Sequence, residues 1–297
     1  MRLGIELIEI RCQKCCVGVS GYGEAEVIKI WQQANAPHKP RRKSPMTTAL
    51  QTDIRATEYL PLASCGCSAA RPKLLDLFCC QGGAGEGYNR AGFDVTGVDI
   101  EPQPKNPHRF ILGDALEYVR DHGHEYDAIH ASPPCQHYSC VTQKKFRGNH
   151  PDLIGLTREA LKATGKPYVI ENVGGARKAL RNPIKLCGSM FGLKTFRHRF
   201  FEIWPCFLLA PSCNHTFRPL LVTTCGARSY KMRRADGQKG KSVKFAPEAY
   251  GITWMTLDGL REAIPPAYTE WIGRQLKQHL LTRQQQNEKL KHGGENL

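Results

Sequence analysis

The chain has 297 residues, enough for one large domain with appendages. Its 42 Lys and Arg residues outnumber its 27 Asp and Glu residues, and the net charge of +15 favours a polyanionic partner such as nucleic acid over an acidic small molecule. The sequence contains no signal peptide and no apolar run that could cross a membrane. We therefore expect a cytoplasmic protein without a membrane partner, whose 13 cysteines stay reduced.

Residues 1–72 are predicted to form an N-terminal appendage and linker that is partly disordered. Cys12 and Cys15 form one CxxC pair, which can supply only two zinc ligands. The stretch 8–15 resembles the second zinc knuckle of the Com family of phage translational regulators. This short resemblance suggests a phage ancestry and does not indicate an activity.

A regular pattern begins at residue 73. The apolar run 74–79 predicts a buried strand, and it is followed by the glycine-rich loop 81–87, a short helix and a second strand at 95–99. This order is typical of a dinucleotide-type βαβ unit, in which glycines let the backbone approach a ligand. The glycine spacing departs from GxGxxG, so the loop alone does not establish a nucleotide site.

Acidic residues accompany three of the predicted strands. Asp76 lies in the first strand, Asp99 ends the second, and Asp114 follows a short strand at 109–112. Carboxylates repel phosphates, but they accept hydrogen bonds from an ammonium, from ribose hydroxyls and from an adenine amino group. The acids therefore favour an adenosyl ligand with an amino-acid tail.

A cysteine follows two prolines after the predicted strand 127–131. The prolines stiffen the turn, so Cys135 is presented in a fixed direction at the carboxyl end of the strand, where open α/β sheets bind ligands. The alternative interpretation is a buried free thiol.

A predicted helix at 152–163 precedes a strand at 166–173 that carries Glu171 near its end. Glu171 therefore falls on the same edge as the cysteine, although a helix-entry acid is the alternative. In the run 195–201, Arg197 and Arg199 alternate onto one strand face and need an anionic or carbonyl partner there.

In this order, the segments from residue 73 to about residue 281 resemble the cytosine-5 DNA methyltransferases, especially the short phage and prophage forms. The resemblance implies an α/β fold with a mainly parallel, doubly wound, Rossmann-like sheet that binds S-adenosylmethionine. The implied parts are a catalytic domain at 73–205, a small basic target-recognition region at 206–250, a returning segment at 251–281 and a polar tail at 282–297.

The resemblance also implies roles for single residues. Cys135 would attack carbon 6 of a flipped cytosine, Glu171 would protonate ring nitrogen 3, and Arg197 and Arg199 would hold the base carbonyl and favour the thiolate. The residues implied for the cofactor are Asp76, Phe78, Gly82, Gly83, Asp99, Ile100, Asp114 and Ala115. Among them, Phe78 and Ile100 would sandwich the adenine, and Asp114 and Ala115 would border its edge. The implied partner is double-stranded DNA bound by a monomer, and the resemblance allows a cognate restriction endonuclease.

The chain departs from the family pattern at three positions. Cys80 stands where glycine is usual, Thr195 replaces a glutamine, and Glu262 occupies the place of an asparagine that supports the catalytic pocket.

Three other functions stay open. An RNA cytosine methyltransferase would prefer single-stranded RNA, and a DNA-binding regulator with a decayed site would transfer no methyl group. A DNA amino-methyltransferase uses an aromatic residue where this chain has Cys135.

A cysteine cluster in the basic region requires a separate interpretation. The residues Cys206, Cys213, His215 and Cys225 could supply four zinc ligands, but their spacing is irregular. We therefore expect ordinary buried thiols here and assign no metal ligand.

Overall fold

The computed structural model describes residues 70–140, 142–205, 208, 210–216 and 246–293, together with the backbones of four short strands elsewhere. The four strands are β1 (Leu7–Arg11), β2 (Gly18–Tyr22), β10 (Leu221–Thr224) and β11 (Lys231–Arg234). The chain divides into two compact units, 1–70 and 71–297. Cys12 and Cys15 of the predicted knuckle, most of the linker, and Cys206 and Cys225 lie outside the described residues.

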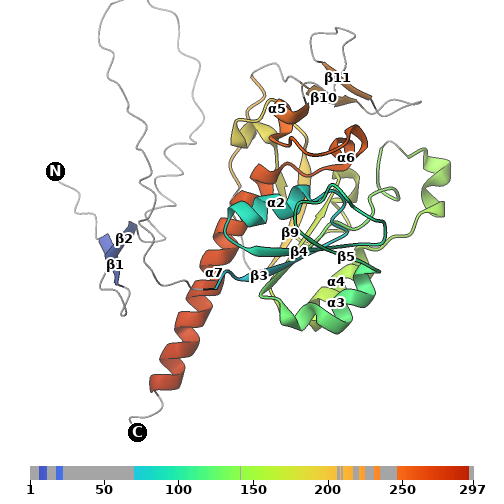
Figure 1. Cartoon of the computed structure of the whole chain (residues 1–297). Helices are drawn as coiled ribbons and strands as arrows, with labels where there is room; N and C mark the ends of the chain where they lie inside the picture. Colours follow the sequence, from blue (N-terminus) through green and yellow to red (C-terminus); the bar gives the residue numbers. More distant parts are fainter. Residues whose placement is uncertain are drawn as a thin grey trace, which may run out of the picture. The chain divides into compact units, whose positions relative to one another are not determined.

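The second unit is built on a seven-stranded sheet with the order β5-β4-β3-β6-β7-β9-β8 (Figure 1). Its strands are β3 (Lys73–Leu77), β4 (Asp94–Asp99), β5 (Arg109–Leu112), β6 (Ala128–Ala131), β7 (Tyr168–Asn172), β8 (Ile184–Leu186) and β9 (Arg199–Trp204). The strands β3 to β7 pair in parallel, and β9 is antiparallel to both β7 and β8. The predicted fold class, a mainly parallel Rossmann-like α/β sheet of the methyltransferase type, is confirmed.

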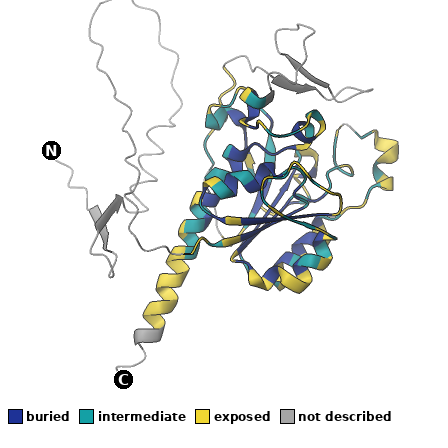
Figure 2. Ribbon diagram, viewed as in Figure 1, coloured by how far each residue is buried: buried dark blue, intermediate teal, exposed yellow. Residues whose placement is uncertain are grey.

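Helices cover both faces of this sheet. The α-helices of the unit are α2 (Gly83–Arg90), α3 (Ala115–His122), α4 (Ile154–Ala163), α5 (Ala246–Tyr250), α6 (Leu257–Glu262) and α7 (Pro266–Gly293). Short 3-10 turns occur at η1 (Gly123–Glu125), η2 (Lys144–Asn149), η3 (Gly174–Ala176) and η4 (Gly188–Phe191). Figures 1 and 2 show α2 and α7 on one side of the buried strands and α3 and α4 on the other.

Two hydrophobic cores follow from the alternation of side chains along the strands. Leu74 packs in the core on the α2 and α7 side, whereas its neighbour Leu75 packs in the core on the α3 and α4 side. Both side chains are fully buried, and burying a leucine stabilises a fold by about 1.5–3 kcal/mol. The apolar run thus places side chains on both faces of the sheet, and helices must cover both faces to bury them.

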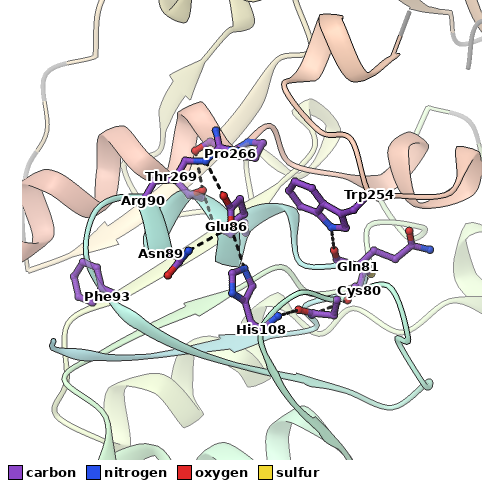
Figure 3. A network of polar contacts seen from close by, with 12 residues as sticks. Cys80, Gln81, Glu86, Asn89, Arg90, Phe93, His108, Trp254, Pro266 and Thr269 are labelled. Carbon is purple, nitrogen blue, oxygen red and sulfur yellow. Dashed lines mark hydrogen bonds and ion pairs between the residues drawn. The ribbon is translucent and has the colours of Figure 1, made fainter. Parts of the chain in front are cut away.

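Helix α2 approaches α7 closely because its residues are small. A Cβ atom at Gly87 would lie 2.1 Å from Thr269 Oγ1 and 2.2 Å from the Pro266 carbonyl oxygen, so the position accepts only glycine. Thr269 Oγ1 in turn donates a hydrogen bond of 2.8 Å to the Ala84 carbonyl (Figure 3). The glycine-rich segment thus serves the contact between two helices as well as the loop before α2.

Three features differ from the sequence prediction. Strand β9 begins at Arg199, so Arg197 precedes the strand. Helix α7 continues to Gly293, through most of the predicted polar tail, and contacts such as Gln284 Nε2 to Glu288 Oε1 (3.4 Å) follow its exposed surface. Cys140 is disulfide-bonded, which corrects the expectation that every thiol stays free. No helix in the described part of the chain is long and apolar enough to cross a membrane.

A buried ion pair joins α4 to β9. Arg158 Nε and Nη2 donate to the two carboxylate oxygens of Glu202 over 2.8 and 2.7 Å. The Arg181 amide and the Tyr168 hydroxyl donate to the same carboxylate, at 2.8 and 3.4 Å. Both charged side chains are less than one-tenth exposed, so each depends on the other for compensation.

We predict that Glu202→Gln lowers the free energy of unfolding by about 3–5 kcal/mol, because it leaves the Arg158 guanidinium buried without its counter-charge. Urea unfolding followed by circular dichroism measures this loss. The matched control is Glu159→Gln, which breaks an exposed pair with Lys162 and should change stability by less than about 1 kcal/mol. Equal effects of the two substitutions would contradict the assignment.

Candidate active site

The carboxyl ends of β6 and β7 and the start of β9 meet at one edge of the sheet. β6 leads into the turn that carries Cys135, β7 carries Glu171, and β9 begins with Arg199. Parallel strands end at the same edge, and an antiparallel neighbour begins there. The topology therefore brings these three predicted residues together.

The turn that carries Cys135 is fixed by hydrogen bonds from both sides. The buried Asn172 side chain donates to the Pro133 carbonyl over 2.9 Å, which ties the turn to β7. The amides of Tyr138 and Ser139 donate to the Cys135 carbonyl over 3.0 and 2.8 Å. Asn172 therefore positions the turn that carries Cys135.

Glu171 and Arg199 form an ion pair at the edge of the sheet. Arg199 Nε lies 2.9 Å from Glu171 Oε1, and the two side chains are 14% and 7% exposed. Burial raises the pKa of Glu171, while Arg199, Arg197 and a hydrogen bond from Ser132 oppose the rise. A carboxyl group held between these influences can keep a proton and also give it up.

The Cys135 thiol has a raised pKa in the free protein. Burial is the main cause, and the charges of Glu171 and Glu262 act in the same direction. Arg199 lowers the pKa, as the sequence predicted, but its effect is outweighed. The expectation of an environment that favours the thiolate is therefore met by Arg199 alone and not by the site as a whole.

A buried polar chain that the sequence did not indicate leads to Glu171. Tyr88 Oη lies 3.0 Å from His130 Nδ1, and His130 Nε2 lies 2.9 Å from Ser132 Oγ. Burial lowers the pKa of His130 to about 3, so its ring is neutral and carries a single N–H. If Tyr88 donates to Nδ1, His130 donates to Ser132, which leaves the Ser132 hydroxyl to donate to Glu171. This series of hydrogen bonds thus orients the Glu171 carboxyl group through Ser132.

Arg197 is buried, and its described contacts go to the C-terminal segment. Its Nε donates to the Ala263 carbonyl over 2.7 Å and its Nη2 to the Arg261 carbonyl over 2.6 Å, and the guanidinium lies 5.2 Å from the Tyr250 ring centre. Arg197 therefore positions that segment, and its charge also reaches Glu171. Contact with a base carbonyl stays a prediction.

Asp76 is the clearest sign of a ligand beside the glycine-rich loop. It is 1% exposed, and neither carboxylate oxygen accepts a hydrogen bond from a side chain within the described residues. Burial raises its pKa to about 8, and the Gly85 amide and the Asp99 charge modify this shift. A carboxylate that is buried without a cationic partner costs stability. A cationic ligand group would therefore find a prepared site here.

The second and third acids already accept backbone hydrogen bonds. Asp99 Oδ2 accepts from the Cys80 amide at 2.9 Å and Oδ1 from the Glu101 amide at 3.1 Å. Asp114 Oδ1 accepts from the amides of Leu116 and Glu117, at 2.8 and 2.9 Å, and so caps α3. Each carboxylate keeps further lone pairs for a ligand.

The apolar residues predicted for adenine also border this edge of the sheet. Ile100 is 71% exposed although it follows a buried strand, and Phe78 is partly buried. Ala115 is buried as the first residue of α3. The sandwich of adenine between Phe78 and Ile100 stays a prediction.

The C-terminal segment holds the loop before α2 (Figure 3). Trp254 Nε1 donates to the Gln81 carbonyl over 2.9 Å, and the Gln81 side chain exchanges two hydrogen bonds of 2.9 Å with Thr256. Gly82 has a φ of 79°, and a Cβ at Gly83 would lie 2.7 Å from the Ile264 carbonyl. Gly83 therefore lets two distant segments meet. The sequence did not predict the contacts of Gln81 with Trp254 and Thr256.

The backbone of Cys80 adopts a conformation that favours glycine. Its φ of 44° lies in the left-handed region, which side chains adopt only with strain. The conformation points the Cys80 amide at Asp99.

The chain is similar to proteins that are described as methyltransferases. No family model matches the chain. Over 122 residues it is 30% identical to the Type II methyltransferase M.XorII of Xanthomonas oryzae pv. oryzae. The matched stretch covers 35% of this chain and only 29% of that relative. Among solved structures, EhMeth of Entamoeba histolytica is 18% identical over 50% of this chain and 58% of its own, with a TM-score of 0.39. Dnmt2 of S. pombe is 18% identical over 45% and 49%, with a TM-score of 0.32.

We predict that Glu262→Gln makes Cys135 more reactive, because it removes a negative charge that raises the pKa of the thiol. Alkylation of the Cys135 peptide by iodoacetamide, followed by mass spectrometry at pH 7.5, should accelerate roughly two- to fivefold. The control is Glu248→Gln, which removes an exposed acid paired with Lys194. An unchanged rate in the Glu262 variant would mean that its charge does not reach the thiol.

Proposed function

We propose that the chain is an S-adenosylmethionine-dependent DNA (cytosine-5)-methyltransferase that acts through a covalent adduct of Cys135. The observation that carries this proposal is the meeting of Cys135, Glu171 and Arg199 at one sheet edge, with the buried Asp76 beside the adjoining loop. A nucleophile, an acid and a group that orients the acid are the set that activation of a cytosine ring requires.

The chemistry begins when the Cys135 thiol loses its proton to solvent and the thiolate sulfur forms a bond to carbon 6 of cytosine. Glu171 gives its proton to ring nitrogen 3 as electron density moves toward that atom, and Arg199 keeps the acid in place. Carbon 5 then becomes nucleophilic, and the cofactor, when bound, supplies the methyl group that carbon 5 takes. Loss of the carbon 5 proton to a base returns an electron pair to the ring, which expels the sulfur as a thiolate, and ring nitrogen 3 returns its proton to Glu171.

A DNA substrate is supported by charge and by the curated relative. The net charge of +15 favours a polyanion, and the matched relative is described as a Type II methyltransferase. Carbon 6 is hidden in a stacked helix, so the target base must be flipped out. The loop that follows Cys135 contains η2, in which Lys145 stacks on the exposed Phe146, and this basic segment is suited to contact DNA.

The residues beside the glycine-rich loop fit the cofactor. Its amino-acid tail carries an ammonium that Asp76 could pair with, its ribose offers hydroxyls to Asp99, and Ile100 presents an exposed apolar surface for adenine. Asp114 keeps one carboxylate oxygen beyond its capping bonds.

We predict that Cys135→Ala abolishes methyl transfer and leaves binding of S-adenosylhomocysteine within about threefold, since the thiol acts only on the base. Tritium transfer to genomic DNA measures activity, and calorimetry measures binding. A duplex with 5-fluorocytosine should trap the native chain covalently and fail to trap the variant, because fluorine cannot leave as a proton.

Parallel assays with single-stranded RNA separate the main proposal from its closest alternative. Preference for RNA over duplex DNA would identify an RNA cytosine methyltransferase. Full activity of the Cys135 variant would refute the covalent mechanism, and a native chain that transfers no methyl group to either substrate would indicate a regulator.

We predict that Asp76→Asn has opposite effects on stability and binding. The unfolded chain ionises this acid near pH 4, whereas the folded chain holds its proton up to about pH 8, so folded stability is lost as the pH rises between these values. Asparagine removes that loss, so at pH 8 it should raise the free energy of unfolding by several kcal/mol at most, since one pKa unit corresponds to about 1.4 kcal/mol, and the melting temperature should rise with it.

The same substitution should weaken S-adenosylhomocysteine binding roughly 10- to 100-fold, because a charge-assisted hydrogen bond contributes about 1.5–3 kcal/mol. Wild-type binding should release a proton near pH 7, measured by calorimetry in buffers of different ionisation enthalpy. Asp94→Asn, at an exposed strand start, is the control. Unchanged binding in the Asp76 variant would exclude it from the cofactor site.

A further inference from the structure

Four side chains with metal-ligand atoms converge outside the candidate active site. Cys187 follows β8, His198 immediately precedes β9, and Cys213 and His215 lie on the segment after β9. Their ligand atoms all lie within 4.8 Å of one another. The group draws on three separate stretches of the chain, which is why no spacing in the sequence revealed it.

The distances within this cluster have the size of a zinc coordination sphere. His198 Nε2 lies 3.3 Å from His215 Nε2, Cys187 Sγ lies 3.3 Å from His215 Nε2, and Cys213 Sγ lies 3.7 Å from His198 Nε2. With Zn–N bonds of about 2.0–2.1 Å and Zn–S bonds of about 2.3 Å, a tetrahedron has N–N edges of about 3.3 Å and N–S edges of about 3.5 Å. The observed separations lie around these values.

Hydrogen bonds alone explain the cluster poorly. Each Nε2 atom has a single proton or a single lone pair, yet each faces both the other ring nitrogen and a thiol. A cation at their centre satisfies all four atoms at once. Ser189 and Phe196 support the arrangement, because Ser189 Oγ lies 3.1 Å from Cys187 Sγ and the Phe196 ring stacks on His215 with the ring centres 4.1 Å apart.

The ligand types identify the metal and its role. Two cysteines and two histidines with tetrahedral spacing are typical of Zn²⁺, and a sphere filled by four protein ligands is typical of a structural site. On binding, each thiol would lose its proton, and both imidazoles would remain neutral. We propose that Cys187, His198, Cys213 and His215 form a structural zinc site.

The position of the site gives it a consequence for the fold. His198 lies between Arg197, which holds the C-terminal segment, and Arg199, which pairs with Glu171. Cys213 and His215 belong to the predicted recognition region 206–250. The zinc ion would therefore fix the backbone from which both arginines extend and tie the start of that region to the sheet.

The proposal replaces the expectation of ordinary thiols in this region. The sequence had grouped Cys213 and His215 with Cys206 and Cys225, which lie outside the described residues. The structure instead places Cys187 and His198 beside the first two. Metal binding here does not depend on the proposed enzymatic activity.

The test uses the full chain purified without chelator, analysed by elemental mass spectrometry and by X-ray absorption at the zinc edge. We expect one tightly held zinc with two sulfur and two nitrogen neighbours. After zinc is exchanged for Co²⁺, the visible spectrum should show intense tetrahedral bands and a thiolate charge-transfer band. A chain that holds neither metal would show that the four residues form only a hydrogen-bonded cluster, which would overturn the proposal.

Variants locate the ion without reference to activity. Cys213→Ser should lose the tightly bound metal, whereas a Cys12→Ser, Cys15→Ser double variant should keep it and so excludes the N-terminal pair. The opposite pattern would overturn the proposal. A Cys213→Ser chain that misfolds would lose the metal for another reason, so His215→Cys supplies a positive test. It exchanges a nitrogen ligand for sulfur and should retain Co²⁺ with a stronger charge-transfer band. A Co²⁺ spectrum unchanged by this exchange would also refute the site.

Discussion

The candidate site depends on the antiparallel pairing of β9 with β7. In this register Glu171 faces Phe201 and Asn172 faces Phe200, so the first residue of β9 arrives beside the last residues of β7. An arginine at the start of one strand thereby meets an acid at the end of the other. A fully parallel sheet would place the start of β9 at the opposite edge, far from Cys135. The single reversed strand thus brings Arg199 to the other two candidate catalytic residues, Cys135 and Glu171.

The second constraint is the contact between the loop before α2 and the segment 254–270 of the same compact unit. The segment 254–270 contacts Gln81, the glycines of the loop and α2, and Arg197 holds this segment from the other side. The contact between Gln81 and Trp254 joins residues 173 positions apart. The proposed cofactor site and the proposed catalytic site therefore share one support, and a change in the C-terminal segment should affect both.

Local patterns predicted much of the fold and part of the site. Strand ends, the glycine-rich loop and the proline turn carry their information within a few residues, so Asp76, Cys135 and Glu171 could be placed on one sheet edge from the sequence. The contacts of Arg197, the buried chain through His130 and the cluster around His198 depend on segments that meet only in three dimensions. The extent of α7 was missed because its final turns are polar, and no apolar face marks them as a helix.

The clamp between Thr256 and Gln81 also bears on how the protein is made. The loop at residues 80–83 leaves the ribosome long before the segment that completes it. During synthesis the early strands can pair, but the loop has no partner until residues 254–270 emerge. The loop consequently acquires these contacts only after residues 254–270 have been made, and a product that terminates before residue 254 lacks them.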